Sequence, residues 1–290
     1  MLDERKKGFA ALMVSTVVWL TFPFIFKAVE HVGSFEVLAH RVVWSAVFML
    51  GMLAVGGIRA DLFAVLRNRR QLLALFATGA LIASNWLAYV IGVQSGRVLD
   101  VSLGFFISPL LAVFLAVIVL REPMRPLQAV AILIAALSTL NLVVQLGELP
   151  LISLSLAATF SAYGILRKTQ NIPAAAGLLV ETVMVLPAAV GYLSWLHWHG
   201  TLGFFAHGPD TALVLVLGGI VTAIPLLTFH IAARFLPYTV VGLTLYLIPS
   251  ILFIMGITLF GEPLSKIRLL TFAGIWLALA LYLAESRLKR

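Results

Sequence analysis

Four ionisable side chains stand inside long apolar stretches of this 290-residue sequence: His40, Arg41, Glu181 and His230. A charged group in apolar surroundings is costly unless it is paired, so each is a candidate for binding a ligand or moving a proton. For Arg41 and Glu181 a second interpretation stays open, in which they join neighbouring helices or support a gate without touching a ligand. For His230 a structural role is favoured over a ligand or a proton relay.

Aromatic and amide side chains form a second set of candidates. They supply the ring faces and the few hydrogen-bond donors that a pocket for a small apolar ligand needs. Core packing is the alternative for each of them. Within the apolar stretches these candidates are Trp19, Trp44, Asn85, Tyr89, Phe105, Tyr163 and Tyr246.

Proline supplies a third kind of candidate, because it frees a backbone carbonyl wherever it interrupts a helix. Pro109 and Pro249 both lie within apolar stretches. We expect them to act as hinge points, and kinks that only improve packing are an equal alternative.

Enzymatic chemistry has little support in the sequence. The chain contains no cysteine, so disulfides, thiolate metal sites and cysteine nucleophiles are excluded. No HExxH or P-loop motif is present, and we expect no metal or cofactor. The aspartates are expected in termini or loops, which makes an intramembrane enzyme the least supported alternative. These aspartates are Asp3, Asp61, Asp100 and Asp210.

The composition indicates that most of the chain is surrounded by lipid. Hydrophobic residues make up 62% of the sequence and charged residues only 11%, and the mean hydropathy is +1.08. Such a chain could not cover a water-facing surface, so a soluble protein is excluded. About 20 apolar residues cross the hydrocarbon core, and the sequence accommodates ten such segments. The predicted spans are 8–29, 35–55, 71–93, 101–120, 127–144, 150–165, 174–195, 211–235, 240–260 and 268–285.

The distribution of cations predicts the orientation of these spans. When alternate loops are assigned to one side, 15 of the 20 Lys and Arg residues lie on the side of the N-terminus. Cytoplasmic loops are enriched in Lys and Arg, so both termini are expected in the cytoplasm. The net charge of +8 is thereby explained by membrane insertion, and no nucleic-acid partner is expected.

An offset of 140 residues aligns the sequence with itself. Pro109 meets Pro249, and Glu122–Pro123 meets Glu262–Pro263. The same offset brings Arg41 onto Glu181, a cation near one side of the membrane against an anion near the other.

These matches predict two repeats, 1–149 and 150–290, each with five helices. Because five is odd, the second repeat enters the membrane from the opposite side and the repeat is inverted. Inverted repeats around a site at the membrane midplane are typical of transporters that work by alternating access. A duplicated structural bundle without transport is the alternative.

Seven sequence segments, in this order along the chain, indicate a known family. They are HRVVWS at 40–45, SNWLAYVIGV at 84–93, SLGFFISPLLAV at 102–113, SAYGILRK at 161–168, ETVMVLPAA at 181–189, GIVTAIPLLTF at 219–229 and FGEP at 260–263. The chain resembles the EamA-type drug/metabolite transporter superfamily over nearly its whole length, and most of all its RarD-type branch.

The resemblance implies an all-α integral membrane protein with ten transmembrane helices in two inverted five-helix repeats, located in the bacterial inner membrane. It also implies export of small metabolites, because relatives include YddG-type exporters of aromatic and other neutral amino acids. We expect an amino acid or similar metabolite as substrate, surrounding lipid, and a monomer. A proton-coupled exporter of drugs such as chloramphenicol is the alternative, in which protons are the coupling ion.

Overall fold

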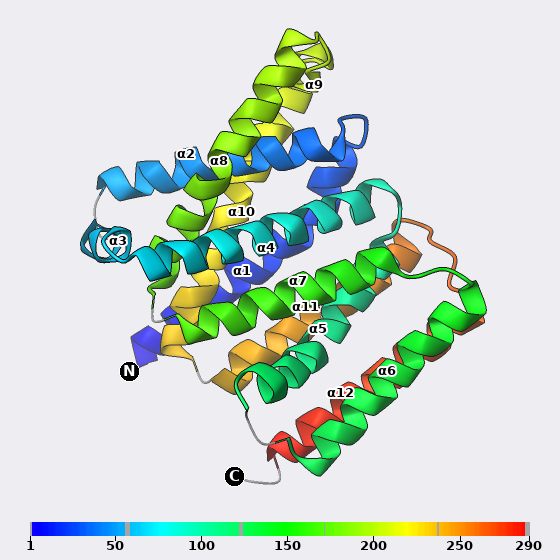
Figure 1. The fold of residues 1–290 in the computed structure, drawn as a ribbon. Helices are drawn as coiled ribbons and strands as arrows, with labels where there is room; N and C mark the ends of the chain where they lie inside the picture. The colour runs from blue at the N-terminus through cyan, green and yellow to red at the C-terminus, as the bar shows by residue number, and fades with distance from the viewer. Residues whose placement is uncertain (1, 56–58, 122–123, 171, 237, 288–290) are drawn as a thin grey trace. The chain divides into compact units, whose positions relative to one another are not determined.

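The computed structural model describes residues 2–55, 59–121, 124–170, 172–236 and 238–287, and every regular element in these ranges is an α-helix. Ten of the helices have 19 residues or more, and Figure 1 labels them. These long helices are α1 (Leu2–Ala28), α2 (Ser34–Val55), α4 (Arg69–Gln94), α5 (Val98–Val119), α6 (Pro126–Leu146), α7 (Leu151–Thr169), α8 (Ala174–Trp198), α10 (Pro209–Phe235), α11 (Tyr238–Thr258) and α12 (Lys266–Arg287).

Each predicted span corresponds to one long helix, so the expected all-helical fold is confirmed. Two short helices were not predicted, α3 (Arg59–Leu66) and α9 (Gly203–Ala206), because eight and four residues are too few to show a helical period. Within the described residues, eight helices are long and apolar enough to cross a membrane, and a shorter apolar helix covers Tyr246–Thr258.

Local signals explain where several helices begin and end. The side chain of Asn68 accepts hydrogen bonds from the backbone N–H groups of Arg70 and Gln71 and so caps α4. Pro126 occupies the first turn of α6, where no N–H is needed, and Gly147 ends that helix with a φ of 68°.

The chain packs as two units, residues 1–95 with 166–248 and residues 96–165 with 249–290. We refer to them as the first unit and the second unit. Each unit combines helices from both predicted halves of the chain. The 140-residue repeat therefore remains a prediction, and its Glu122–Pro123 pair lies outside the described residues.

In the first unit, α2 packs along both α8 and α10, while α1 packs along α10 and α4 along α8. Glycines allow two of these helix pairs to approach closely. A Cβ on Gly79 of α4 would lie 3.1 Å from the backbone oxygen of Glu181 on α8. A Cβ on Gly219 of α10 would collide with Trp44 on α2. Both positions are therefore restricted to glycine by packing.

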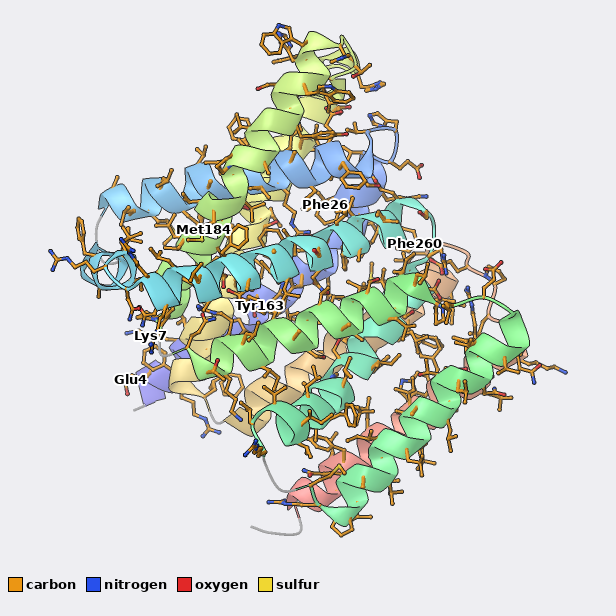
Figure 2. All side chains as sticks on the ribbon, in the orientation of Figure 1. Glu4, Lys7, Phe26, Tyr163, Met184 and Phe260 are labelled. Carbon is orange, nitrogen blue, oxygen red and sulfur yellow. The ribbon has the colours of Figure 1, made fainter. Side chains whose placement is uncertain are left out.

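Apolar side chains fill the rest of the first unit. Met184 of α8, labelled in Figure 2, packs against the buried residues Val65, Leu75 and Val180. Val65 belongs to the short helix α3, which packs against both α4 and α8. This helix, which lies between the predicted spans 35–55 and 71–93, thus contributes to the core.

The second unit is built on the long contact between α6 and α12, which run side by side in Figure 1. Gly274 of α12 sits against Ser138 of α6, where a Cβ would collide with the serine hydroxyl. The opposite face of α6 exposes an apolar stripe, which suits contact with lipid. This stripe consists of Val130, Leu133, Leu137, Leu140 and Val144.

The two predicted hinge prolines interrupt α5 and α11 in the second unit. Buried serines satisfy carbonyls beside them. The hydroxyl of Ser161 donates to the carbonyl of Ser108, which precedes Pro109, and the hydroxyl of Ser102 donates to the carbonyl of Pro249, each at 2.8 Å. Hinge motion at either proline remains a prediction.

Three of the four aspartates lie elsewhere than expected, because Asp61 belongs to α3 and Asp210 to the first turn of α10, and Asp100 is also in a helix. Asp100 does not lie in a loop but in the first turn of α5, where it is buried. Its carboxylate pairs with Arg97 at 2.6 Å and lies 3.7 Å from Arg268. A carboxylate is favourable at a helix N-terminus, which explains why the helix begins before the aspartate rather than after it.

A second carboxylate caps the same helix. Glu262 lies in the connection before α12, and both of its carboxylate oxygens accept hydrogen bonds from the first turn of α5. One bond comes from the N–H of Val98, and the other comes from the N–H of Leu99, at 3.0 Å. Burial raises the pKa of Glu262, and these two N–H groups together with Arg268 oppose the rise. Glu262 therefore fixes the start of α5 against the α11–α12 connection.

We expect Glu262→Gln to lower the free energy of unfolding by about 1–2 kcal/mol, because the amide keeps only one acceptor and loses the charge that favours a helix N-terminus. Glu148→Gln is the matched control, since Glu148 is exposed. Thermal unfolding of the purified variants in detergent measures both. Equal melting temperatures for the two variants would contradict the capping role.

Candidate functional site

The first unit contains two deeply buried side chains of opposite charge, Arg41 on α2 and Glu181 on α8. Their exposed fractions are 3% and 1%. Three further carboxylates are buried in the described residues, Glu36, Asp100 and Glu262, but each lies in a first helical turn or a loop. Glu181 thus lies deeper within a helix than any of them.

Arg41 reaches from α2 toward α1 and is surrounded by aromatic rings. Its guanidinium carbon lies 5.1 Å from the ring centres of both Phe22 and Phe26 and 4.6 Å from that of Trp86. The Nε atom donates a hydrogen bond of 2.7 Å to the hydroxyl of Thr222 on α10. Aromatic faces stabilise a cation, so this cage holds the charge in place without neutralising it.

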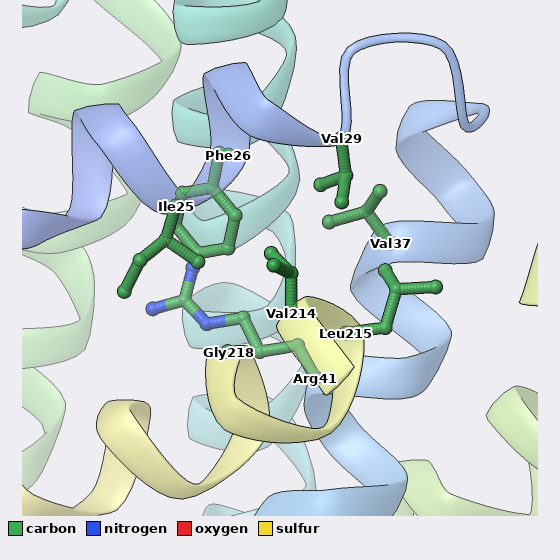
Figure 3. Close-up of a pocket in the computed structure, with 8 residues that line it drawn as sticks. All are labelled: Ile25, Phe26, Val29, Val37, Arg41, Val214, Leu215 and Gly218. Atoms are coloured by element: carbon green, nitrogen blue, oxygen red, sulfur yellow. The ribbon is translucent and has the colours of Figure 1, made fainter. Parts of the chain in front are cut away.

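A small apolar hollow adjoins Arg41, and Figure 3 shows the guanidinium extending from α2 toward Ile25 and Phe26. Helices α1, α2 and α10 form its walls. The hollow is closed and has no room for a bound molecule. Its remaining lining residues are Val29, Val37, Val214, Leu215 and Gly218.

Glu181 is satisfied by two partners. The hydroxyl of Thr78 on α4 donates to its carboxylate at 2.6 Å, and Nε of Arg167 at the end of α7 lies 3.7 Å away. Arg167 fits there because Gly177 has no side chain, since a Cβ at that position would overlap the guanidinium. A cavity no larger than a single water molecule also adjoins Glu181 and is lined by Val42 and Trp86 among others.

The surroundings of the two charges match each other. Arg41 on α2 bonds to a threonine of α10, and Glu181 on α8 bonds to a threonine of α4. Under the predicted repeat, the contact of α2 with α10 corresponds to that of α8 with α4. Trp86 lies between the two environments, since its ring faces Arg41 and also lines the cavity beside Glu181.

His40 belongs to a different environment from its neighbour Arg41. Its ring stacks on Phe204 of α9 with centres 4.6 Å apart, and its Nε2 lies 3.7 Å from the carboxylate of Glu36. Glu36 accepts a hydrogen bond of 3.1 Å from the backbone N–H of Phe204. Trp44, one turn further along α2, also stacks on Phe204. His40 and Trp44 thus hold the short helix α9 against α2.

Of the other predicted residues in this unit, Tyr89 lies near Arg41. It is buried against the same two rings that flank the arginine, Phe22 and Phe26. Trp19 instead packs on Phe229, with ring centres 5.5 Å apart.

For three further predicted residues the structure gives the helix, and for two of them it also gives the burial of the side chain. Asn85 is buried on α4, and Tyr246 is half-buried on α11. His230 belongs to α10, but its side chain lies outside the described residues.

The remaining predicted residues are in the second unit. Phe105 of α5 and Tyr163 of α7 both approach Phe160, with ring centres 6.1 and 6.5 Å apart, and Tyr163 is labelled in Figure 2. Pro109 and Pro249 lie in the same unit. These four residues thus belong to a different unit from Arg41 and Glu181.

Sequence reasoning missed the residues that satisfy the two charges, above all Thr78, Thr222 and Arg167. A threonine in an apolar helix is too common to single out. Arg167 was used as a sign of membrane orientation and as part of the SAYGILRK segment, and not as a partner of Glu181. One signal in the sequence could have pointed to Thr78. It directly precedes Gly79, and the 140-residue offset aligns Gly79 with Gly219, which marks both glycines as positions where helices could pack closely.

We expect Thr78→Val to lower the free energy of unfolding by about 1–3 kcal/mol, because the buried Glu181 loses its closest donor. Thr182→Val is the matched control and should cost less than about 1 kcal/mol, since the buried Thr182 bonds only to its own helix. Unfolding by SDS in mixed micelles measures both. Equal losses would show that Thr78 does not support Glu181.

Comparisons with known proteins agree with this architecture. Residues 6–144 match the EamA-like transporter family. An uncharacterized transporter of Pseudomonas aeruginosa is 41% identical, and the alignment covers 96% of this chain and 93% of that protein. Protein RarD of Escherichia coli is 32% identical, with 98% and 96% covered. The chloramphenicol-sensitive protein RarD of Pseudomonas aeruginosa is 30% identical, with 95% and 93% covered.

A solved crystal structure is similar over 98% of this chain and 99% of its own, with a TM-score of 0.58 and 18% sequence identity, which shows a shared fold. Together with the ten long helices, the full-length relatives settle the class of protein. The chain belongs to the EamA-like transporter family, in its RarD-type branch, and is a multi-pass membrane transporter.

Proposed function

We propose that this transporter exports small metabolites across the bacterial inner membrane by alternating access, and that amino acids with aromatic or other neutral side chains are its favoured substrates. The observation that carries the proposal is the pair of opposite charges, Arg41 and Glu181, buried on two helices that pack together. A transporter of polar molecules needs such groups within its apolar interior, whereas a purely structural bundle does not.

Aromatic side chains near Arg41 support the choice of substrate class. Phe22, Phe26, Trp86 and Tyr89 gather around its guanidinium or around one another. Ring faces next to a single polar anchor suit a small molecule with one charged end and one apolar end. The closed hollow beside Arg41 is consistent with a site that opens only when helices separate, as alternating access requires.

A second candidate function is proton-coupled export of drugs such as chloramphenicol. Glu181 favours it, because a buried carboxylate beside a water-sized cavity is the kind of group that can carry a proton across a membrane. Trp19, Tyr163 and the other predicted site residues remain candidates under both functions. We expect a monomer in either case.

Transport by the purified protein in liposomes distinguishes these functions. With labelled amino acids inside and an excess of unlabelled ones outside, we expect exchange of at least one aromatic or other neutral amino acid, above the rate in protein-free liposomes. Glu181→Gln should abolish any stimulation by a pH gradient if protons are coupled. Movement of chloramphenicol without exchange of any amino acid would support the second candidate instead.

The proposed orientation, with both termini in the cytoplasm, can be tested directly because the chain has no cysteine. Glu4 and Thr201 are exposed and lie on opposite sides in the predicted arrangement. In intact cells a membrane-impermeant maleimide should label Thr201→Cys at once, and Glu4→Cys only after the membrane is permeabilised. The reverse pattern would overturn the orientation.

A further inference from the structure

The two buried charges of the first unit differ in one respect: within the described residues, Glu181 has a counter-ion and Arg41 has none. The carboxylate of Glu181 receives the hydroxyl of Thr78 and lies beside Arg167. Among the described residues, no carboxylate pairs with Arg41. Its Nε is bonded to Thr222, while its Nη1 is buried and has no hydrogen-bond partner in the part of the chain that the structure describes.

An unpaired guanidinium nitrogen at such depth calls for an explanation. Buried polar atoms are nearly always hydrogen-bonded, and an exception can mark a place where a water, an ion or a ligand binds. The rings of Phe22, Phe26 and Trp86 stabilise the positive charge, yet ring faces are poor substitutes for the oxygen acceptors that N–H groups require. An acceptor with negative charge would satisfy this nitrogen and balance the charge of the guanidinium.

We propose that the Nη1 side of Arg41 binds the carboxylate of the transported substrate, and that Glu181 does not bind the substrate's ammonium group. This inference rests on the proposed function and narrows its substrate class to molecules with an anionic end and an apolar tail. Arginine forms strong, directional hydrogen bonds with carboxylates, whereas Glu181 is already paired with Arg167. Lipophilic cations and uncharged drugs lack the group that Arg41 requires.

We place the apolar tail in the hollow beside Arg41, which has no room for a ligand in this structure and would widen when the helices separate. It is lined by aliphatic and aromatic side chains and by Gly218, the point where the α10 backbone faces it (Figure 3). A Cβ on Gly218 would lie 3.7 Å from both Ile25 and Phe26, an ordinary contact. Gly218→Ala therefore fills part of the hollow without disturbing the fold.

Three probes that share a phenyl ring separate the two charges of an amino acid: phenylalanine, 3-phenylpropionate, which has only the carboxylate, and phenethylamine, which has only the ammonium group. Calorimetric titration of the full-length protein in lipid nanodiscs measures their binding. We expect phenylalanine and 3-phenylpropionate to bind with affinities within about threefold of each other, and phenethylamine at least about thirtyfold more weakly. Preference for phenethylamine, or no binding of either carboxylate, would overturn the proposal.

Variants test the assignment to Arg41 itself. Arg41→Gln should weaken binding of both carboxylates at least about thirtyfold, and Arg41→Lys, which keeps the charge but loses the planar fork, should weaken it less. Gly218→Ala should weaken binding about fivefold or more, as expected when a methyl group occupies space that the ligand needs. Gly191→Ala is the control for the helix substitution, because a Cβ there meets nothing within 4 Å, and it should bind as the parent does.

Failure of the inference and failure of the proposed function give different results. Exchange of amino acids in liposomes that Arg41→Gln leaves intact would refute the carboxylate site while the proposed function stands. Arg41-dependent binding of 3-phenylpropionate without exchange of any amino acid would support the carboxylate site and refute amino acids as the substrate class. The comparison of the three probes uses the unaltered protein, so it stays decisive even if Arg41→Gln does not fold.

Discussion

A charge that water cannot reach has to be satisfied by other means, and this requirement organises the first unit of the transporter. Glu181 meets it with Thr78 and Arg167, and Arg41 meets it in part with Thr222 and a ring of aromatic side chains. Hydrogen bonds between helices require the helices to be close, and Gly79 and Gly219 permit that approach at α4 with α8 and at α2 with α10. The contacts of Arg41 and Glu181 thus join four helices in two pairs, α2 with α10 and α4 with α8.

Most of the fold could be predicted from the sequence, because a helix that crosses lipid must be apolar over about 20 residues and this pattern is easy to read. The short helices α3 and α9 could not be predicted, because they are too short to show a pattern of their own. Both are held by tertiary contacts, α3 through Val65 in a core cluster and α9 through Glu36 and His40 of α2. Asp100 was misplaced because a helix start depends on the partners of its first N–H groups, here supplied by the distant Glu262.

The candidate site was predicted less completely. Arg41 and Glu181 stood out because charges in apolar segments are rare. Tyr89 packs on the rings that flank Arg41, and its role in binding remains a prediction. His40 instead holds α9 in place, and Phe105 and Tyr163 lie in the second unit. A sequence shows which residues are unusual, but the neighbours that satisfy them come from distant segments, as Thr222 does for Arg41 across 181 positions. For this reason the difference between a paired Glu181 and an incompletely paired Arg41 emerged only from the structure.

A structure of the transporter with bound phenylalanine tests the central claim most directly, namely that Arg41 lacks a protein partner because the substrate provides it. The account predicts a carboxylate oxygen within about 3 Å of Nη1 of Arg41, the phenyl ring between α1 and α10, and Glu181 still paired with Arg167. A ligand whose ammonium group lies on Glu181, while Nη1 of Arg41 remains without a partner, would contradict it.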